Sequence, residues 1–92
     1  MNLIHLRYEK DQSSKLHTIL YLGEQDDKII GLEENHILID EINFIRERLS
    51  DPQINIVEWI KENIPSYKSA YRTFFKKQVT ILQIHEIKPL KK

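Results

Sequence analysis

Residues 78–87, QVTILQIHEI, decide what kind of fold this chain can form. The segment is rich in β-branched residues and has the length of a single strand. Alternation places its apolar side chains on both faces, Val79, Ile81 and Ile87 on one and Leu82 and Ile84 on the other. A strand that is apolar on both faces is typically covered on both sides. We therefore expect a central or well-covered strand near the C-terminal end of the chain.

The beginning of the chain supplies neighbours for that strand. Residues 2–9, NLIHLRYE, and 15–24, KLHTILYLGE, alternate as strands do, and Gly23 either ends the second strand or bulges it. The polar stretch between them predicts an antiparallel β-hairpin with a loop longer than two residues. We expect the C-terminal strand to join this hairpin. Residues 28–39 hold two short apolar runs that fit one strand, two strands or a loop.

The middle of the chain changes to helical periodicity. Apolar residues recur every three or four positions over 41–50, and Asp40 is a suitable N-cap, so a first helix is predicted there. Residues 51–52, Asp-Pro, are a typical start signal for a second helix over 52–63. That helix is expected to end before Pro65, because the residue before a proline is disfavoured in the α region.

A third helix is predicted over 67–77, YKSAYRTFFKK, with Ser66 as its cap. On a helical wheel the charges Lys68, Arg72 and Lys76 form one basic stripe. The apolar and aromatic residues share the opposite arc: Tyr67, Ala70, Tyr71, Phe74 and Phe75. We interpret that arc as core, which leaves no obvious platform on which a base could stack. The stripe has no acidic partner within the helix and is available for phosphates or an acidic protein.

Together these segments predict an α+β fold: an N-terminal antiparallel β-hairpin or meander, three consecutive short helices, and a C-terminal strand that returns to the sheet. Residues 1–87 are expected to form a single domain, followed by an exposed basic tail over 88–92. The 92 residues include no cysteine, which excludes disulfides and thiolate metal sites. No targeting segment or membrane span is recognised, so we expect a cytoplasmic protein.

Charge is divided unevenly along a chain whose net charge is zero. Residues 1–64 hold 7 Lys or Arg and 13 Asp or Glu, whereas residues 65–92 hold 7 and 1. The candidate basic binding residues are Lys68, Arg72, Lys76, Lys77, Lys88, Lys91 and Lys92. The candidate acidic docking residues are Glu24, Asp26, Asp27, Glu33 and Glu34. Such asymmetry predicts something about partners and nothing about the fold.

Other side chains carry weaker indications. The four histidines, His5, His17, His36 and His85, lack the spacing of a helical metal site, and we expect no metal or cofactor. The acidic loops lack calcium-loop spacing, and Gly31 alone cannot form a glycine-rich phosphate cradle. Trp59 is interpreted as a partly buried anchor or, if exposed, as an interface residue.

No catalytic signature stands out, so the leading hypothesis is a non-catalytic regulator, inhibitor or accessory subunit that docks on a larger protein or nucleoprotein complex. The first alternative is nucleic-acid binding through the third helix and the tail, including a helix-turn-helix in which Ser66, Tyr67, Lys68, Tyr71 and Arg72 face the major groove. The second is a small metal-independent ribonuclease that uses Tyr, Arg, Lys and His85. A homo-oligomer joined through the two oppositely charged parts is also compatible with the sequence.

Overall fold

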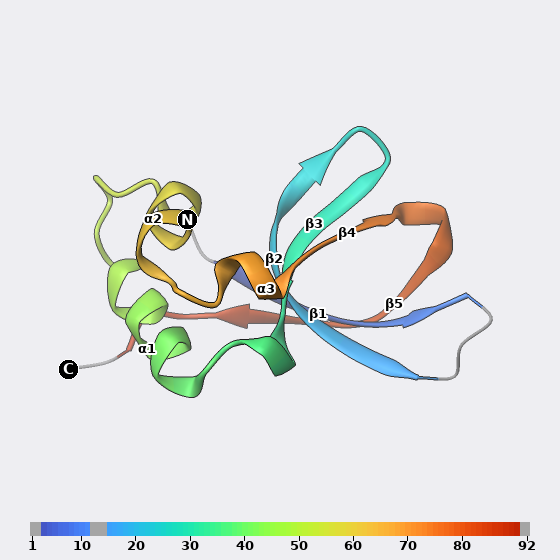
Figure 1. The fold of residues 1–92 in the computed structure, drawn as a ribbon, viewed down its shortest axis with the longest axis horizontal. Helices are drawn as coiled ribbons and strands as arrows, with labels where there is room; N and C mark the ends of the chain where they lie inside the picture. The colour runs from blue at the N-terminus through green and yellow to red at the C-terminus, as the bar shows by residue number, and fades with distance from the viewer. Residues whose placement is uncertain (1–2, 12–14, 91–92) are drawn as a thin grey trace.

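The structure, a computed structural model, describes residues 3–11 and 15–90. This part of the chain forms an α+β fold with helices gathered at one end of a five-stranded antiparallel sheet (Figure 1). The strands are β1 (Leu3–Lys10), β2 (Leu16–Gln25), β3 (Lys28–Glu33), β4 (Tyr71–Phe75) and β5 (Val79–Ile87). The helices are α1 (Ile39–Arg48), α2 (Ile56–Asn63) and the short α3 (Tyr67–Ala70), with 3-10 turns η1 (Glu34–His36) and η2 (Lys76–Gln78).

The order of the strands requires the sheet to bend. The order is β4-β3-β2-β1-β5, so β4 and β5 lie at opposite edges although only η2 separates them in the chain. Two backbone hydrogen bonds hold η2 at the corner where these edges converge. Lys76 N donates to Asp27 O at 2.7 Å, and Asp11 N donates to Gln78 O at 2.9 Å. Figure 1 shows the end of β2 rising with β3 and β4 away from the pair formed by β1 and β5, while the start of β2 runs beside β1.

The bend gives the sheet a concave face with its own small core. The rings of Tyr8 on β1 and Phe74 on β4 lie 4.9 Å apart. In a flat sheet these strands would be about 14 Å apart, since strands are spaced by about 4.8 Å and two other strands lie between them. Tyr8 belongs to a buried cluster with Leu6, Ile19 and Ile29, against which Phe74 and Val79 pack. All five strands therefore contribute to this second core.

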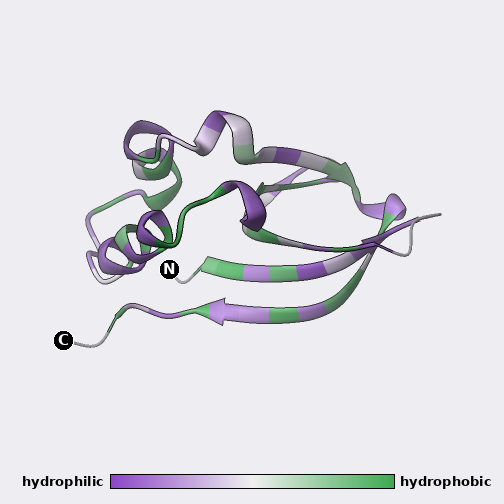
Figure 2. Cartoon of the chain, turned by 60° about the horizontal axis from the view of Figure 1, so that its bottom comes forward, coloured by the Kyte–Doolittle hydropathy of each residue, from purple (hydrophilic) through white to green (hydrophobic). Residues whose placement is uncertain are grey.

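The other face of the sheet is covered by the helices over part of its area. Along the strands hydrophobic and hydrophilic residues alternate (Figure 2), which separates the two faces. The larger core cluster contains residues of both layers: Leu3, Leu20, Leu32 and Ile87 from the sheet, and Ile45, Leu49, Ile56, Ile60, Ile64 and Ala70 from the helical segment, with Ile37. This helix-covered face holds most of the buried apolar surface.

A buried carboxylate fixes how the helical segment returns to the sheet. Glu41 on α1 is only 6% exposed and accepts hydrogen bonds from Leu38 N at 2.9 Å, Ser66 N at 3.1 Å and Ser66 Oγ at 2.7 Å. Burial opposes ionisation, but these hydrogen bonds outweigh it, and the pKa of Glu41 lies below its usual value. The start of α1 is thereby tied to the residue that precedes α3 and β4.

The first two predicted helices are present with shifted starts. α1 begins at Ile39, so that Asp40 lies in its first turn and Leu38 is the N-cap. α2 begins at Ile56 instead of residue 52, with Asn55 accepting a hydrogen bond from Glu58 N. The Asp-Pro signal instead forms a turn, in which Asp51 Oδ1 accepts from Gln53 N at 2.9 Å. The predicted end before Pro65 is confirmed, since the helix ends at Asn63.

The prediction of a third helix over 67–77 is wrong. α3 ends at Ala70, residues 71–75 form β4, and residues 76–78 form η2. Its aromatic and β-branched sequence, YRTFF, suits a strand, and pairing with β3 provides contacts that a surface helix would lack. The basic stripe therefore does not exist as one row. The helix-turn-helix interpretation fails with it, because α3, with four residues, is too short for a recognition helix.

The C-terminal strand joins the hairpin as predicted but is not covered. β5 pairs with β1 and lies at an edge of the sheet, where residues 80–86 are all exposed. The ladder steps from Gln83 to Ile81 and skips Leu82, which marks a bulge. The expectation of a central, well-covered strand is wrong because apolar alternation does not reveal strand order. Gly23 does bulge β2, and residues 28–33 form one strand.

Candidate nucleic-acid interface

Strand pairing brings polar side chains from distant parts of the chain onto the concave face. His17 lies opposite Tyr8, Arg72 lies opposite Gly31, and Phe74 lies opposite Ile29. Because residues opposite each other project to the same face, these side chains share the face of the second core. We define the concave-face site as six residues, of which η1 supplies one: Lys10, His17, Glu33, His36, Arg72 and Phe74.

An imidazole and a carboxylate are paired near the middle of this site. His17 Nδ1 lies 3.1 Å from Glu33 Oε1, and both side chains are largely buried. The His17 ring stacks on Tyr8 at 5.4 Å between centroids, which holds the plane of the imidazole. Burial and the Glu33 carboxylate raise the pKa of Tyr8. Tyr8 Oη and Glu33 Oε2 are both buried, and the Glu33 carboxylate lies beside the Tyr8 hydroxyl.

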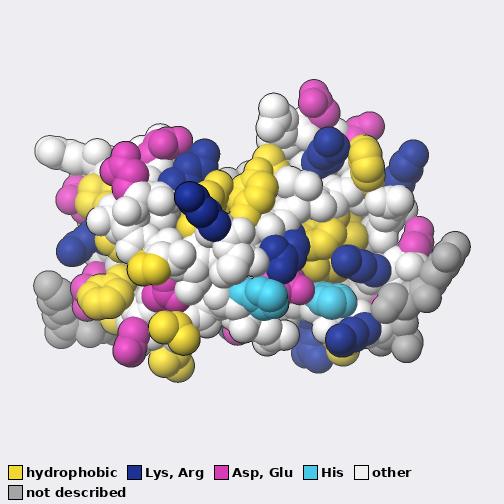
Figure 3. Space-filling model, in the orientation of Figure 1, with side chains coloured by type: hydrophobic (Ala, Val, Ile, Leu, Met, Phe, Trp, Pro, Cys, Tyr) yellow, Lys and Arg dark blue, Asp and Glu magenta, His cyan; other side chains and the backbone are white. Residues whose placement is uncertain are grey.

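A guanidinium group is fixed beside the second histidine. Arg72 Nη1 donates to Ser69 O at 2.8 Å and to Tyr71 O at 2.7 Å. Arg72 Nη2 lies 3.5 Å from His36 Nδ1. In Figure 3 two histidines occupy the centre of one face, with acidic atoms between them and basic and hydrophobic side chains beside them. The arrangement holds one permanent positive charge in a defined position at the surface.

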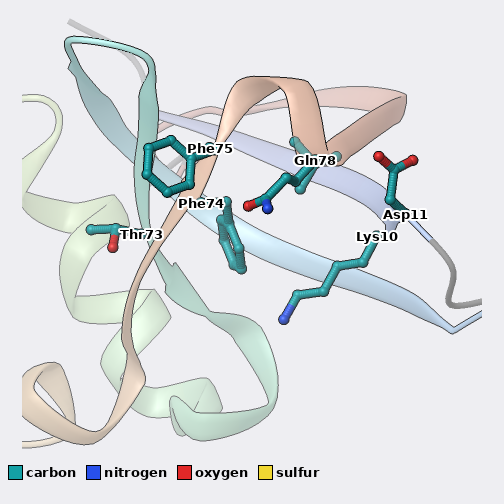
Figure 4. A pocket seen from close by; sticks show the side chains of 7 residues that line it. Lys10, Asp11, Thr73, Phe74, Phe75 and Gln78 are labelled. Carbon is teal, nitrogen blue, oxygen red and sulfur yellow. The ribbon is translucent and has the colours of Figure 1, made fainter.

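Next to these groups is a hollow with an aromatic wall. It encloses about 550 Å³ and is lined by Lys10, Asp11, Thr73, Phe74, Phe75, Gln78 and Val79. Figure 4 shows the Phe74 ring and the Lys10 side chain extending toward the same space. Lys10 Nζ lies 5.2 Å from the centroid of Phe74. The hollow therefore combines a partly exposed aromatic ring with an ammonium group, the two kinds of group with which proteins contact the bases and phosphates of a single strand.

Phe75 shows that the predicted core assignment was too broad. It projects from the opposite side of β4, and it is 44% exposed. Lys28 Nζ lies 5.2 Å and Lys77 Nζ 5.9 Å from its ring. We interpreted Tyr67, Ala70, Tyr71, Phe74 and Phe75 as core residues that leave no aromatic surface for stacking. For Phe75 this interpretation is wrong, because its ring is exposed.

The predicted basic residues do not form one surface. Arg72 belongs to the concave-face site, whereas Lys68 is exposed on α3 and Lys88 follows β5. Lys76 Nζ is paired with Glu24 Oε2 at 2.7 Å, and Lys77 lies beside Phe75. The pairing raises the pKa of Lys76 and lowers that of Glu24. The remaining two residues, Lys91 and Lys92, lie outside the described residues.

The predicted acidic surface is also divided. Asp26 and Asp27 form the turn between β2 and β3, and Glu24 is used by Lys76. Glu33 contacts His17 on the concave face, whereas Glu34 lines a hollow elsewhere. Trp59 is partly buried against the larger core, with the Arg48 guanidinium carbon 5.7 Å from its ring. Trp59 is therefore partly buried, and its role as an interface residue stays a prediction.

The other two histidines lie on the opposite face of the sheet. His5 and His85 are directly opposite each other and line a hollow of about 270 Å³ with Arg7, Thr18, Glu34 and Gln83. Burial lowers the pKa of His5. Within residues 3–11 and 15–90, no group of three or more His, Cys, Asp or Glu could hold a metal ion.

The sequence indicates Arg72 as a basic binding residue and Glu33 as an acidic docking residue, but it does not indicate that these two, the histidines, Lys10 and Phe74 form one site. The alternation of the two hairpin strands was the signal that could have placed His17 and Tyr8 on one face, because these residues lie opposite each other in the hairpin.

Among the described helices, none has the length and apolar character needed to cross a membrane. Comparison with known proteins finds no matching family model, no matching curated protein and no matching solved structure.

Proposed function

We propose that this protein binds single-stranded nucleic acid on the concave-face site. The observation that carries the proposal is the partly exposed Phe74 ring with Lys10 5.2 Å above it, in a hollow of about 550 Å³. Binding of single strands combines bases stacked on aromatic rings with cations that follow the backbone. Arg72, fixed on the same face, supplies a second cation for a neighbouring phosphate.

A single strand suits the site better than a duplex. Readout of the major groove needs a helix or a two-stranded ribbon that enters the groove, and α3 has only four residues. Stacking on Phe74 requires a base with a free face, which a paired strand does not offer. The zero net charge of the chain supports a small number of phosphate contacts instead of a broad basic surface.

Salt dependence tests the proposal directly. A fluorescein-labelled single-stranded DNA of mixed sequence is titrated with the protein, and anisotropy gives the Kd at several salt concentrations. The permanent cations Lys10 and Arg72 predict a slope of about −1.4 in log affinity against log salt, at roughly 0.7 per phosphate contact. Arg72→Gln should reduce the slope to about −0.7. Lys61→Gln, which removes an exposed charge from α2, serves as the matched control.

Two results would count against the proposal. The first is an affinity that does not change with salt. The second is an equal loss of affinity in Arg72→Gln and Lys61→Gln, since this would trace binding to overall charge and not to the concave face. A duplex of the same sequence should bind more weakly than the single strand.

A second candidate function, docking on a larger protein partner, is supported by β5. Within the described residues β5 pairs only with β1, and its exposed side chains include Ile81, Leu82 and Ile84. An extended segment of a partner could add to this edge as a further antiparallel strand. Ile84→Lys should then abolish recovery of that partner, while Leu38→Lys on the exposed surface near α1 should not.

The recovered complex provides the structural check on this second function. Hydrogen exchange of the β5 amides should be slower in the complex than in the isolated chain, because a sixth strand would protect them. Unchanged exchange would contradict strand addition. Self-assembly through opposite charges predicts instead a mass that falls as salt rises, measured by sedimentation.

A further inference from the structure

We infer that the concave-face site cleaves RNA strands, with His17 as general base, Arg72 as the group that stabilises the reacting phosphate, and His36 as general acid. The inference rests on the proposed function, because the strand must first bind across this face. It assigns a role to groups that binding alone does not require. These are the imidazole–carboxylate pair of His17 and Glu33 and the contact of Arg72 with His36.

The surroundings of His17 favour its action as a base. Its Nδ1 lies 3.1 Å from Glu33 Oε1, so that the proton of the neutral ring is held on Nδ1 and Nε2 is left as the acceptor. Stacking on Tyr8 keeps the ring plane in place. Glu33 is a positioning residue in this scheme, because it acts through His17 and does not touch the substrate. A carboxylate in this position also stabilises the imidazolium that forms after proton transfer.

Arg72 and His36 are placed to bind the reacting phosphate and to protonate the leaving oxygen. Two backbone carbonyls hold the Arg72 guanidinium, and its remaining N–H groups can donate to a phosphate. His36 is exposed and its Nδ1 lies 3.5 Å from Arg72 Nη2, so a phosphate bound by Arg72 lies within reach of this imidazole. Phe74 and Lys10, in the adjacent hollow, would hold a neighbouring base and phosphate.

The reaction is an internal transesterification that needs no co-reactant. His17 Nε2 takes the proton of the ribose 2′-hydroxyl as the 2′-oxygen forms a bond to phosphorus. The bond from phosphorus to the 5′-oxygen of the next nucleotide breaks, and His36 donates a proton to that oxygen. Arg72 stabilises the added negative charge on the phosphate oxygens. The products are a 2′,3′-cyclic phosphate and a free 5′-hydroxyl, and DNA, which lacks the 2′-hydroxyl, is bound but not cleaved.

The two faces of the sheet offer two histidine pairs, and the geometry favours the concave one. His5 lies mostly buried opposite His85, and its Nε2 is buried without a hydrogen-bond partner among the described residues. The described residues that line the hollow around that pair include no Phe, Tyr or Trp ring. The sequence-based ribonuclease hypothesis relied on His85, whereas the concave face combines paired groups, a fixed cation and an aromatic wall.

The experiment compares two strands of identical sequence, one of RNA and one of DNA, in buffer with a chelator of divalent ions. Wild-type protein is expected to bind both and to cut only the RNA, with products resolved by gel and the cyclic phosphate identified by mass. His17→Gln should lower the cleavage rate at least about 100-fold. A circular dichroism spectrum and a urea midpoint like those of the wild type show that the variant is folded.

Two further variants test the role of Glu33 and the face of the sheet on which cleavage takes place. Glu33→Gln should slow cleavage less than His17→Gln and should lower kcat while leaving KM unchanged, because the imidazole remains but the carboxylate that orients it is lost. A purely structural role for Glu33 would change KM and the urea midpoint as well. His85→Gln, altered on the opposite face, should cleave at the wild-type rate.

The outcomes separate this inference from the proposed function. Binding of the DNA strand with no cleavage of the RNA overturns the inference and leaves the proposed function standing. Absence of binding to either strand overturns both. Cleavage that survives His17→Gln, or that is lost in His85→Gln alone, would place the chemistry away from the concave face.

Discussion

The two faces of the sheet differ in what their polar groups do. On the helix-covered face, the buried carboxylate of Glu41 accepts three hydrogen bonds and joins α1 to the segment before α3. On the concave face, His17 is paired with Glu33 and the Arg72 guanidinium is held by two backbone carbonyls at the surface. Polar groups on the first face therefore join parts of the fold, whereas those on the second present an imidazole, a carboxylate and a cation beside a hollow. We propose that the second set is used on a ligand.

The largest expected loss of stability comes from a substitution in the core of the helix-covered face. Ile60 on α2 is 0% exposed, so Ile60→Ala should lower the free energy of unfolding by about 2–5 kcal/mol. Ile84→Ala on β5 is the matched control, because Ile84 is 64% exposed and leaves no cavity. Urea denaturation followed by circular dichroism measures both. Equal losses in the two variants would contradict the assignment of the main core to the helices.

A smaller loss of stability is expected when the buried carboxylate of Glu41 is replaced. Glu41→Gln should lower the free energy of unfolding by about 1–3 kcal/mol at neutral pH, since hydrogen bonds to a charged acceptor are lost. The folded-state pKa of Glu41 is lowered, so its stabilisation is present above the unfolded-state pKa and is lost as pH falls through the folded pKa. The two proteins should therefore become similar in stability in acid. A gap that widens as pH falls would contradict this sign.

The smallest effect is expected at the exposed ion pair between Lys76 and Glu24. Both side chains are solvated, and screening makes such pairs weak. Glu24→Gln should leave the urea midpoint unchanged within error. It should, however, free the Lys76 charge and steepen the salt dependence of strand binding if the strand extends past the concave-face site to η2. A clear loss of stability in Glu24→Gln would contradict this expectation and show that the ion pair between Lys76 and Glu24 stabilises η2.

Parts of this architecture follow from sequence pattern and parts do not. The hairpin, the two longer helices and the pairing of β5 with β1 follow from alternation, helical spacing and the break at Pro65. The helix prediction for residues 67–77 was wrong because the side chains of this segment fit a helical wheel as well as a strand. Pairing with β3, which no local pattern shows, favours the strand over residues 71–75. No local pattern reports strand order, so the exposed edge at β5 was not predictable.

The candidate site depends on the same long-range information. His17 and Glu33 are 16 positions apart, and His36 and Arg72 are 36 apart. The first contact therefore requires β2 to pair with β3, and the second requires β4 to pair with β3. The dipeptide of Phe74 and Phe75 was visible in the sequence, but helical periodicity assigned both rings to the core. Strand alternation places them on opposite sides of β4 and leaves Phe75 exposed.

The most direct test of the central claim is the affinity for the single-stranded DNA of Phe74→Leu compared with Phe44→Leu. Leucine keeps an apolar side chain in the second core but removes the aromatic face, while Phe44 is an exposed ring on α1, away from the site. At constant low salt, Phe74→Leu should raise the Kd roughly 5-fold to 150-fold, the value of one stacked base, and Phe44→Leu should leave it unchanged. Equal affinity of Phe74→Leu and the wild-type protein would contradict binding on the concave face.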